Sequence, residues 1–379
     1  MAAEDADVSF DDNDDDYLKS SDIQEKLPQY ALYGTTGFAV LLFLGVFVWL
    51  QFPSESIEAE LRAMRPQMTM RVPPMRRSAR DAATPRGEAG AERSSEERTP
   101  SVPEAAKRRS AVLHPHPDPK LVERSDIGML PIIGTDGRKP WRVYSRPFNV
   151  LEKRPRIAIV MTGLGVSFNA TESVVGVLPG EVTLAFAPYA QKLKEWIDAA
   201  RGAGHEVLIN LPMEPRDYPR SDPGPFGLLT GLDVEQNRRR LDWVLSRMTG
   251  YVGVTNYLGD RFTSSQSGMR PVLRELERRG LMFLDSMESN VSVGPKTAKS
   301  LNLPLAISDR AIDVITSRAD IDRKLAELET IAKTQGVAVA LARPYPVTIR
   351  RLQRWIRDLD EKGLALAPIT AVVNKQSLR

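Results

Sequence analysis

The chain has 379 residues, no cysteine, and a formal net charge of +3. The lack of cysteine excludes disulfides, thiolate metal sites and a cysteine nucleophile. So small a net charge is not typical of a nucleic-acid-binding protein, and the sequence predicts no nucleic-acid partner.

The first two predicted elements are an acidic tail over residues 1–29 and an uncharged apolar run over residues 30–52. The tail cannot bury enough apolar surface to offset chain entropy, so we expect it to be disordered. At about 1.5 Å per residue, the apolar run can span a hydrocarbon core of about 30 Å. Tyr30, Tyr33 and Trp49 lie near its ends, as interfacial anchors do. The run predicts one transmembrane helix rather than a buried core helix or a cleaved signal peptide.

The orientation of this helix rests on a weak charge signal. Lys19 and Lys26 precede the span, and Arg62 and Arg65 follow it, so the positive charges are nearly even. Long domains cross the membrane largely regardless of such charges. We favour a single-pass protein of the inner membrane, with the acidic tail in the cytoplasm and the large domain in the periplasm.

A linker and a strap follow the predicted membrane helix. Residues 53–121 alternate Pro, Arg, Glu, Ser and Ala without apolar periodicity, which predicts an extended, disordered linker. The motif HPHPDP at 114–119 reads as a surface spacer rather than a metal clamp. Residues 122–154 then predict an ordered lead-in strap with a turn at Asp136-Gly137.

The remainder of the chain, residues 155–373, alternates short apolar runs with amphipathic stretches. The predicted strands are 157–161, 182–186, 207–210, 252–255, 282–284, 305–307, 337–341 and 364–368. The predicted helices are 169–177, 191–203, 233–248, 266–279, 320–335 and 347–362. This alternation predicts an α/β fold with a mostly parallel sheet, open or closed into a barrel. A length of roughly 230 residues suits a (β/α) barrel.

In such folds, ligands bind beyond the carboxyl ends of the strands. The stretch VLINLPMEP at 207–215 ends a buried run in a polar corner, so we expect Glu214 to line the mouth of the barrel. Other polar residues follow other strands, and we expect them around the same cleft. They are Tyr189, Asn210, Asn256, Asp285, Asp309 and Arg343.

Several familiar chemistries are excluded by their missing motifs. The stretch GLGVSF lacks the third glycine of a dinucleotide fingerprint, and no Walker loop is present. No G-x-S-x-G nucleophile elbow occurs. His205 is the one histidine of the barrel, and it precedes a strand at the end opposite the cleft. We interpret it as a loop-orienting residue rather than a catalytic base.

Seven blocks occur in order between residues 157 and 352: IAIVMTGLG, VTLAFAPYA, AGHEVLINLPMEP, PGPFGLLTGL, GYVGVTNYLGDRFTS, RGLMFLDS and ARPYPVTIRRL. Together they resemble the divergent polysaccharide deacetylases, relatives of the metal-dependent carbohydrate esterases. The resemblance implies a deformed (β/α) barrel over about 155–373. It also implies a role in carbohydrate metabolism.

The residues at the positions implied for the metal site differ from the family pattern. Such deacetylases place an aspartate pair after the first strand, where this chain has Met161-Thr162. Histidines of the family correspond to Asn210, Tyr257 and Arg343 here. Catalytic zinc usually takes histidine or cysteine ligands, and Arg343 would repel a cation. We therefore predict no metal and no other cofactor.

Two functional hypotheses remain. In the favoured one, the barrel is a former esterase that binds a cell-envelope glycan or an envelope protein. In the alternative, an active hydrolase uses a rebuilt site with Asp285 or Glu214 as general acid or base. Under either hypothesis, the predicted ligand-binding residues are Asn210, Asn256, Arg343, Asp309 and Tyr189.

Each carboxylate also has a structural interpretation. Asp285 can cap the turn after its strand, and Glu214 can pair with Arg216, Arg220 or Arg343. A hard cation is a further possibility for the carboxylates Glu214, Asp285, Asp309 and Asp313.

Overall fold

The computed structural model describes residues 111–377, which belong to the larger of two compact units, Arg93–Arg379. The predicted acidic tail, the predicted membrane helix at 30–52 and most of the predicted linker lie outside the described residues. Among residues 111–377, no helix combines the length and the apolarity needed to cross a membrane.

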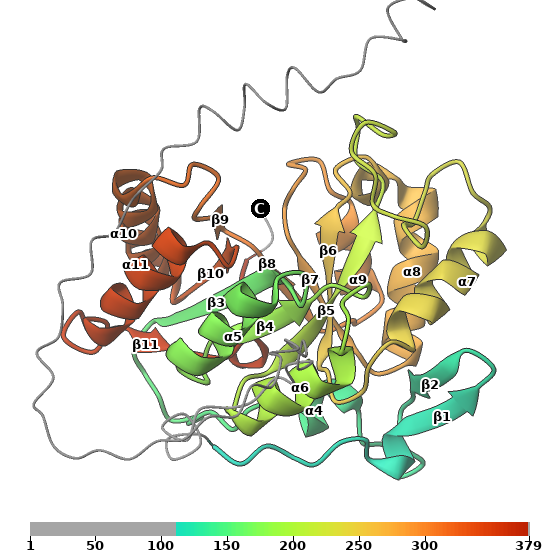
Figure 1. Cartoon of the computed structure of the whole chain (residues 1–379), viewed down its shortest axis with the longest axis horizontal. Helices are drawn as coiled ribbons and strands as arrows, with labels where there is room; N and C mark the ends of the chain where they lie inside the picture. The colour runs from blue at the N-terminus through green and yellow to red at the C-terminus, as the bar shows by residue number, and fades with distance from the viewer. Residues whose placement is uncertain (1–110, 378–379) are drawn as a thin grey trace, which may run out of the picture. The chain divides into compact units, whose positions relative to one another are not determined.

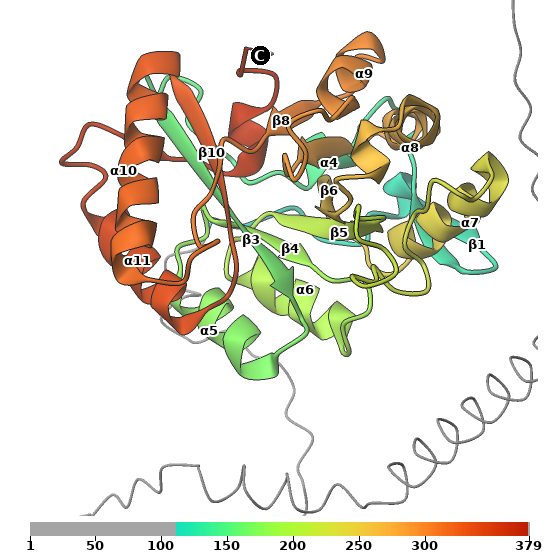
Figure 2. The same cartoon turned by 90° about the horizontal axis from the view of Figure 1, so that it is seen from above.

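The described residues form a curled parallel sheet of nine strands (Figures 1 and 2). The hydrogen-bonded order is β8-β7-β6-β5-β4-β3-β10-β9, and β11 also pairs with β3. The strands are β3 (Arg156–Leu164), β4 (Thr183–Phe186), β5 (Val207–Met213), β6 (Gly253–Leu258), β7 (Met282–Asp285), β8 (Leu305–Ile307), β9 (Arg310–Ala311), β10 (Val337–Ala342) and β11 (Ala365–Leu366). This confirms the predicted parallel α/β architecture.

Helices cover the outer face of this sheet (Figure 2). They are α5 (Phe168–Val177), α6 (Leu193–Gly202), α7 (Val234–Leu245), α8 (Gln266–Arg278), α9 (Gly294–Ser300), α10 (Arg318–Gln335) and α11 (Pro346–Arg357). Helix α8 illustrates why they form. Ser265 caps its first turn, and Met269, Val272 and Leu276 lie on one buried face at helical spacing.

Side-chain alternation along the strands builds two apolar cores. On β3, Ile157, Ile159 and Met161 pack outward against the helices. Ala158 and Val160 point the other way, into the inside of the curled sheet. The period of two in a strand therefore places one core between sheet and helices and a second core inside the curl.

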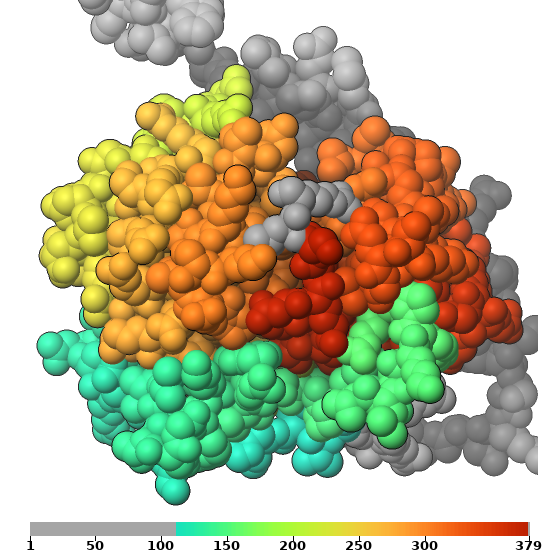
Figure 3. Space-filling view, turned by 180° about the vertical axis from the view of Figure 1, so that it is seen from behind, coloured from blue at the N-terminus to red at the C-terminus, as the bar shows by residue number. Residues whose placement is uncertain are grey.

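The lead-in strap closes the amino-terminal end of the barrel (Figure 3). It contains η1 (Pro119–Leu121), the antiparallel hairpin of β1 (Val122–Ser125) and β2 (Gly128–Pro131), and α4 (Pro140–Val143). Leu121 and Tyr144 of the strap pack in the inner core with Ile369 and Val372 of η3 (Ile369–Val372). Since Leu121 is fully buried, the expected linker boundary at residue 121 lies too late.

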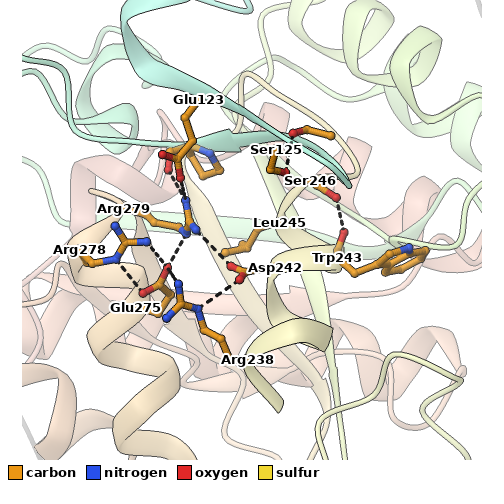
Figure 4. A network of polar contacts seen from close by, with 12 residues as sticks. Glu123, Ser125, Arg238, Asp242, Trp243, Leu245, Ser246, Glu275, Arg278 and Arg279 are labelled. Atoms are coloured by element: carbon orange, nitrogen blue, oxygen red, sulfur yellow. Dashed lines mark hydrogen bonds and ion pairs between the residues drawn. The ribbon is translucent and has the colours of Figure 1, made fainter. Parts of the chain in front are cut away.

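A buried arginine joins the hairpin to the helices (Figure 4). Arg279, just after α8, is 2% exposed and contacts three carboxylates. Its guanidinium lies 2.9 Å from Glu123 of β1, 3.2 Å from Asp242 of α7 and 2.7 Å from Glu275 of α8. Arg279 therefore ties the strap to two helices through charge-assisted contacts.

The structure extends one predicted strand and adds a short strand and a short helix that were not predicted. Strand β5 continues through Pro212 to Met213, because these residues still pair with Tyr257 and Leu258 of β6. The polar corner therefore lies at the end of the strand rather than beyond it. Strand β9 has two residues and α9 has seven, and both are too short to produce a clear apolar period.

Candidate functional site

A cleft of about 1140 Å³ lies at the carboxyl ends of the strands. Its walls come from the loops after β3, β4, β5, β7 and β10, together with residues of the carboxyl-terminal halves of β3, β5 and β6. Its charged lining residues are Lys192, Asp222, Glu288 and Arg343. Its aromatic lining residues are Phe168, Tyr189, Trp196, Tyr257 and Tyr345. This is the end of the barrel at which the sequence predicted a site.

Asn210 lines the cleft from β5 and is only 2% exposed. Its Oδ1 accepts a hydrogen bond of 3.1 Å from the backbone N–H of Gly163, which lies in the irregular stretch at the end of β3. Gly163 has φ +72°, a left-handed conformation that glycine adopts without strain. The Nδ2 of Asn210 has no hydrogen-bond partner among the described residues. The site therefore contains a buried donor that is free to meet a ligand or a water.

Asn256 lines the cleft from β6, but its amide is fully used by the protein. Its Nδ2 donates to the Leu258 carbonyl at 2.9 Å and to Ser286 Oγ at 2.6 Å. Its Oδ1 accepts from the Ser286 N–H at 2.9 Å. Asn256 therefore ties the end of β6 to the loop after β7, and it presents the Ser286 hydroxyl to the cleft.

Arg343 enters the cleft directly after β10. Ala342 pairs with Met161 of β3, so Arg343 lies beside Thr162. Its backbone N–H donates to Asp313 Oδ2 at 2.7 Å, which fixes the residue without using its charge. Its guanidinium lies 3.4 Å from the Tyr345 hydroxyl. Within residues 111–377, no carboxylate lies within ion-pair distance of this guanidinium.

Tyr189 supports one wall of the cleft. Its hydroxyl accepts a hydrogen bond of 3.1 Å from the Phe226 N–H and donates to the Pro223 carbonyl at 3.3 Å. Its ring packs on Trp243 with a centroid distance of 5.6 Å, and Trp243 stacks on Phe226 at 3.7 Å. Tyr189 therefore holds the loop around Pro223 and Phe226 against the barrel.

Glu214 and Asp285 do not line the cleft, in contrast to the expectation from the sequence. Glu214 is buried, and it accepts hydrogen bonds from the Thr230 backbone and hydroxyl and pairs with Arg261 Nη1 at 3.2 Å. The expected pairing with Arg216, Arg220 or Arg343 is therefore replaced by Arg261. These partners turn the Glu214 carboxylate away from the mouth of the barrel and use it to hold a loop.

Asp285 is fully buried and has the structural role that the sequence offered as its alternative. Its carboxylate accepts from the Met287 N–H at 2.9 Å and from Ser292 Oγ at 2.7 Å, which caps the turn after β7. Burial raises the pKa of Asp285 above its ordinary value, and the hydrogen bonds from Ser292 and Met287 oppose this shift.

Asp309 and Asp313 also lie outside the cleft lining. Asp309 Oδ2 accepts from the Val339 N–H and from Gln376 Nε2, both at 2.9 Å. Asp309, which follows β8, therefore connects β10 to Gln376 near the carboxyl terminus. Asp313 accepts from Arg343 and from the Thr348 hydroxyl.

The side chains present do not fit the metal site that the resemblance implies. No three His, Cys, Asp or Glu side chains in the described part of the chain come together as metal ligands. Glu214, Asp285, Asp309 and Asp313 each bind separate protein donors, so they do not converge on one ion. The residues at the former ligand positions supply a hydroxyl, an amide, a phenol and a guanidinium, which do not match a zinc donor set.

Three charged cleft residues were not predicted from the sequence: Lys192, Asp222 and Glu288. Of these, Glu288 has a raised pKa. Glu288 stands in the loop after β7, two residues beyond Ser286, whereas the predicted site residue of this region was Asp285, the last residue of the strand. The residue is exposed by its total surface area, yet partial burial of its carboxyl group raises its pKa above the ordinary value. The charge of Asp260 adds to this rise and that of Arg343 opposes it. The path of this loop brings Glu288 into the cleft, and no local sequence pattern predicts that path.

The chain matches the family model described as divergent polysaccharide deacetylase over residues 159–373. It is 38% identical to the uncharacterized protein ATU2773 from Agrobacterium tumefaciens C58, with a TM-score of 0.64 over 65% of this chain and 100% of that chain. It is 27% identical over 220 residues to the uncharacterized protein YibQ of Escherichia coli, which covers 58% of this chain and 68% of YibQ. An uncharacterized protein of Haemophilus influenzae is 27% identical over 206 residues, 54% of this chain and 72% of that protein. This chain belongs to the divergent polysaccharide deacetylase family.

Proposed function

We propose that this protein is a single-pass protein of the inner membrane whose periplasmic barrel binds a cell-envelope glycan without metal-dependent deacetylation. The uncharged run at 30–52 supports the anchor. The family supports a carbohydrate ligand.

One observation carries the proposal: the cleft combines aromatic faces with the buried Nδ2 donor of Asn210, which has no partner among the described residues, and those residues form no metal donor set. A sugar ring presents an apolar face of C–H groups that packs on an aromatic ring, and its hydroxyl and amide groups need polar partners. The cleft of about 1140 Å³ is large enough for several sugar units. It offers no zinc ligand set to polarise an acetamide carbonyl.

Binding is tested by calorimetry of the full-length protein in mild detergent with chitotetraose. We expect saturable binding that Tyr257→Ala weakens roughly tenfold, since Tyr257 is 46% exposed in the cleft and contributes a ring face. Tyr218→Ala is the matched control, because Tyr218 is 37% exposed but does not line the cleft. Equal loss in both variants, or no binding of any glycan, would contradict the proposal.

Catalysis is tested separately by acetate release from chitotetraose. We expect none above the uncatalysed rate, with or without added zinc. Stoichiometric zinc in the purified protein, together with acetate release that a chelator abolishes, would overturn the non-metal part of the proposal.

The alternative, a metal-independent hydrolase, now depends on Glu288 rather than on Asp285 or Glu214. Glu288 lies in the cleft with a raised pKa, which is typical of a general acid, whereas the other two carboxylates are committed to loop contacts. Turnover that persists in chelator and disappears in Glu288→Gln would favour this alternative.

A further inference from the structure

Two donor groups of the cleft, the Arg343 guanidinium and the Asn210 Nδ2, have no anionic hydrogen-bond or ion-pair partner among the described residues, and both residues lie beside the carboxyl-terminal end of β3. We propose that the deep part of the cleft binds the carboxylate of an acidic sugar, held by the Arg343 guanidinium and the Asn210 amide. This inference rests on the proposed glycan binding and adds the chemical class of the glycan.

The orientation of the Asn210 amide is set by the protein. The N–H of Gly163 needs an oxygen acceptor, so the atom 3.1 Å away is Oδ1 and the unpartnered atom is the Nδ2 donor. A buried donor left unpaired bears the full cost of losing its hydration. A ligand oxygen would satisfy this donor, and a charged oxygen forms the stronger hydrogen bond.

The Arg343 guanidinium is similarly available. Its backbone N–H is held by Asp313, while its side chain contacts only the Tyr345 hydroxyl among the interactions of the described residues. Arginine presents a planar fork of donors that matches a carboxylate with two parallel hydrogen bonds. An arginine held in a cleft with this fork free is suited to such a group.

The strand register brings the two donors together. Ala342 pairs with Met161, so Arg343 lies beside Thr162 at the end of β3. The next residue of β3, Gly163, is the one that Asn210 contacts. Arg343 and Asn210 therefore flank the same short stretch of β3, and both of them line the cleft together with Thr162 and Gly163.

The other charges of the cleft favour a single carboxylate over a polyanion. Glu288 and Asp222 line the same cleft as Arg343 and Lys192, so its formal charges balance. A phosphate group, with about two negative charges and no planar match, would meet repulsion from Glu288. The aromatic lining suits the ring that carries the carboxylate.

The test compares three oligosaccharides on the full-length protein by calorimetry. They are a hyaluronan tetrasaccharide, its carboxyl methyl ester and neutral chitotetraose. The ester keeps the sugar backbone of the acid, removes the charge of each carboxyl group and adds one methyl group to it. We expect the acid to bind at least roughly tenfold more tightly than the ester, as the loss of a charge-assisted contact predicts.

Two variants locate the effect. Arg343→Gln should remove the preference for the acid, because the variant lacks the charge that distinguishes the acid from the ester. Asn210→Asp keeps the oxygen that meets Gly163 but replaces the donor with a negative oxygen, so it should weaken the acid more than the ester. Arg220→Gln is the control, because Arg220 is 85% exposed outside the cleft. A melting temperature measured for each variant checks folding.

The outcomes separate the two proposals. Equal binding of acid and ester, or a preference that survives in Arg343→Gln, overturns the carboxylate site and leaves glycan binding in place. A failure of all three oligosaccharides to bind overturns both.

Discussion

The two ends of the barrel use charged and polar residues in opposite ways. At the amino-terminal end, the strap covers the sheet, and Arg279, Arg201 and Arg146 are buried against acceptors from distant segments. At the carboxyl-terminal end, Arg343 is exposed in an open cleft with no carboxylate in ion-pair distance among the described residues. Arginine residues thus connect segments of the fold at one end, whereas at the other end an arginine remains available to bind a ligand.

The difference follows from desolvation. A charge taken out of water costs several kcal/mol unless partners replace its hydration, so buried arginines must be paired within the fold. A charge in an open cleft keeps its water until a ligand arrives, so the fold does not need to pair it. At the closed end, each buried guanidinium has several protein acceptors, although Arg201 Nε and Arg279 Nε have no hydrogen-bond partner among the described residues. At the open end, the Arg343 guanidinium hydrogen-bonds only to a tyrosine hydroxyl within residues 111–377, so most of its donors remain for a partner from outside.

The largest expected effect comes from Arg279→Gln at the closed end. The substitution leaves Glu275 and Asp242 with less compensation in a buried site, although Arg238 still contacts both. We expect the free energy of unfolding of the full-length protein to fall by roughly 3 kcal/mol in urea. A loss below about 1 kcal/mol would show that the strap is held mainly by its apolar contacts.

The next prediction concerns the pH dependence of the free energy of unfolding that is due to Glu206, which is buried just before β5. Burial raises its pKa to about 7, while the Thr370 hydroxyl and the Arg146 and Thr370 N–H groups lower it. Between about pH 4.5 and 7 the folded state binds the proton more tightly than the unfolded state, so stability falls as pH rises. Relative to Glu206→Gln, the wild type should lose on the order of 3 kcal/mol across this window, and little below it.

This prediction is checked by urea unfolding of both proteins at pH 4, 6 and 8. Parallel pH profiles of the wild type and Glu206→Gln would contradict it. They would mean that the carboxylate is already ionised throughout and is stabilised by its three donors.

A smaller effect is expected from Arg343→Gln in the cleft. Its backbone contact with Asp313 is kept, and the exposed guanidinium forms no ion pair with a described residue. We expect the free energy of unfolding to change by less than about 0.5 kcal/mol, while the affinity for an acidic glycan falls to that for its neutral ester. A destabilisation as large as that of Arg279→Gln would show that Arg343 also has a structural role, and would contradict the difference between the two ends.

The smallest effect is expected from Arg220→Gln. Arg220 and Asp217 form an exposed pair three residues apart at 3.3 Å, which water and salt screen. Neither the urea midpoint nor glycan affinity should change measurably. A change in glycan affinity would show that Arg220 itself takes part in the site, and a change in the urea midpoint would show that its pair with Asp217 stabilises the fold.

Much of the fold was already determined by local sequence. Apolar runs such as Val207–Ile209 predicted strands, and the apolar residues of α8 recur at helical spacing. Strand–helix alternation then predicted a parallel sheet and the end at which a cleft would lie. These signals are local, because a strand or helix needs its apolar period whatever its neighbours are.

Only the tertiary structure decided which polar residues face the cleft. Asn210 and Asp285 both stand at or near the end of a strand, yet Asn210 lines the cleft and Asp285 is bound by the turn that follows it. Glu214 is turned away by Thr230 and Arg261, and Glu288 is brought in by its loop. A polar side chain points toward its hydrogen-bond partners, and those partners come from loops whose positions are set by long-range packing rather than by the residues next to it.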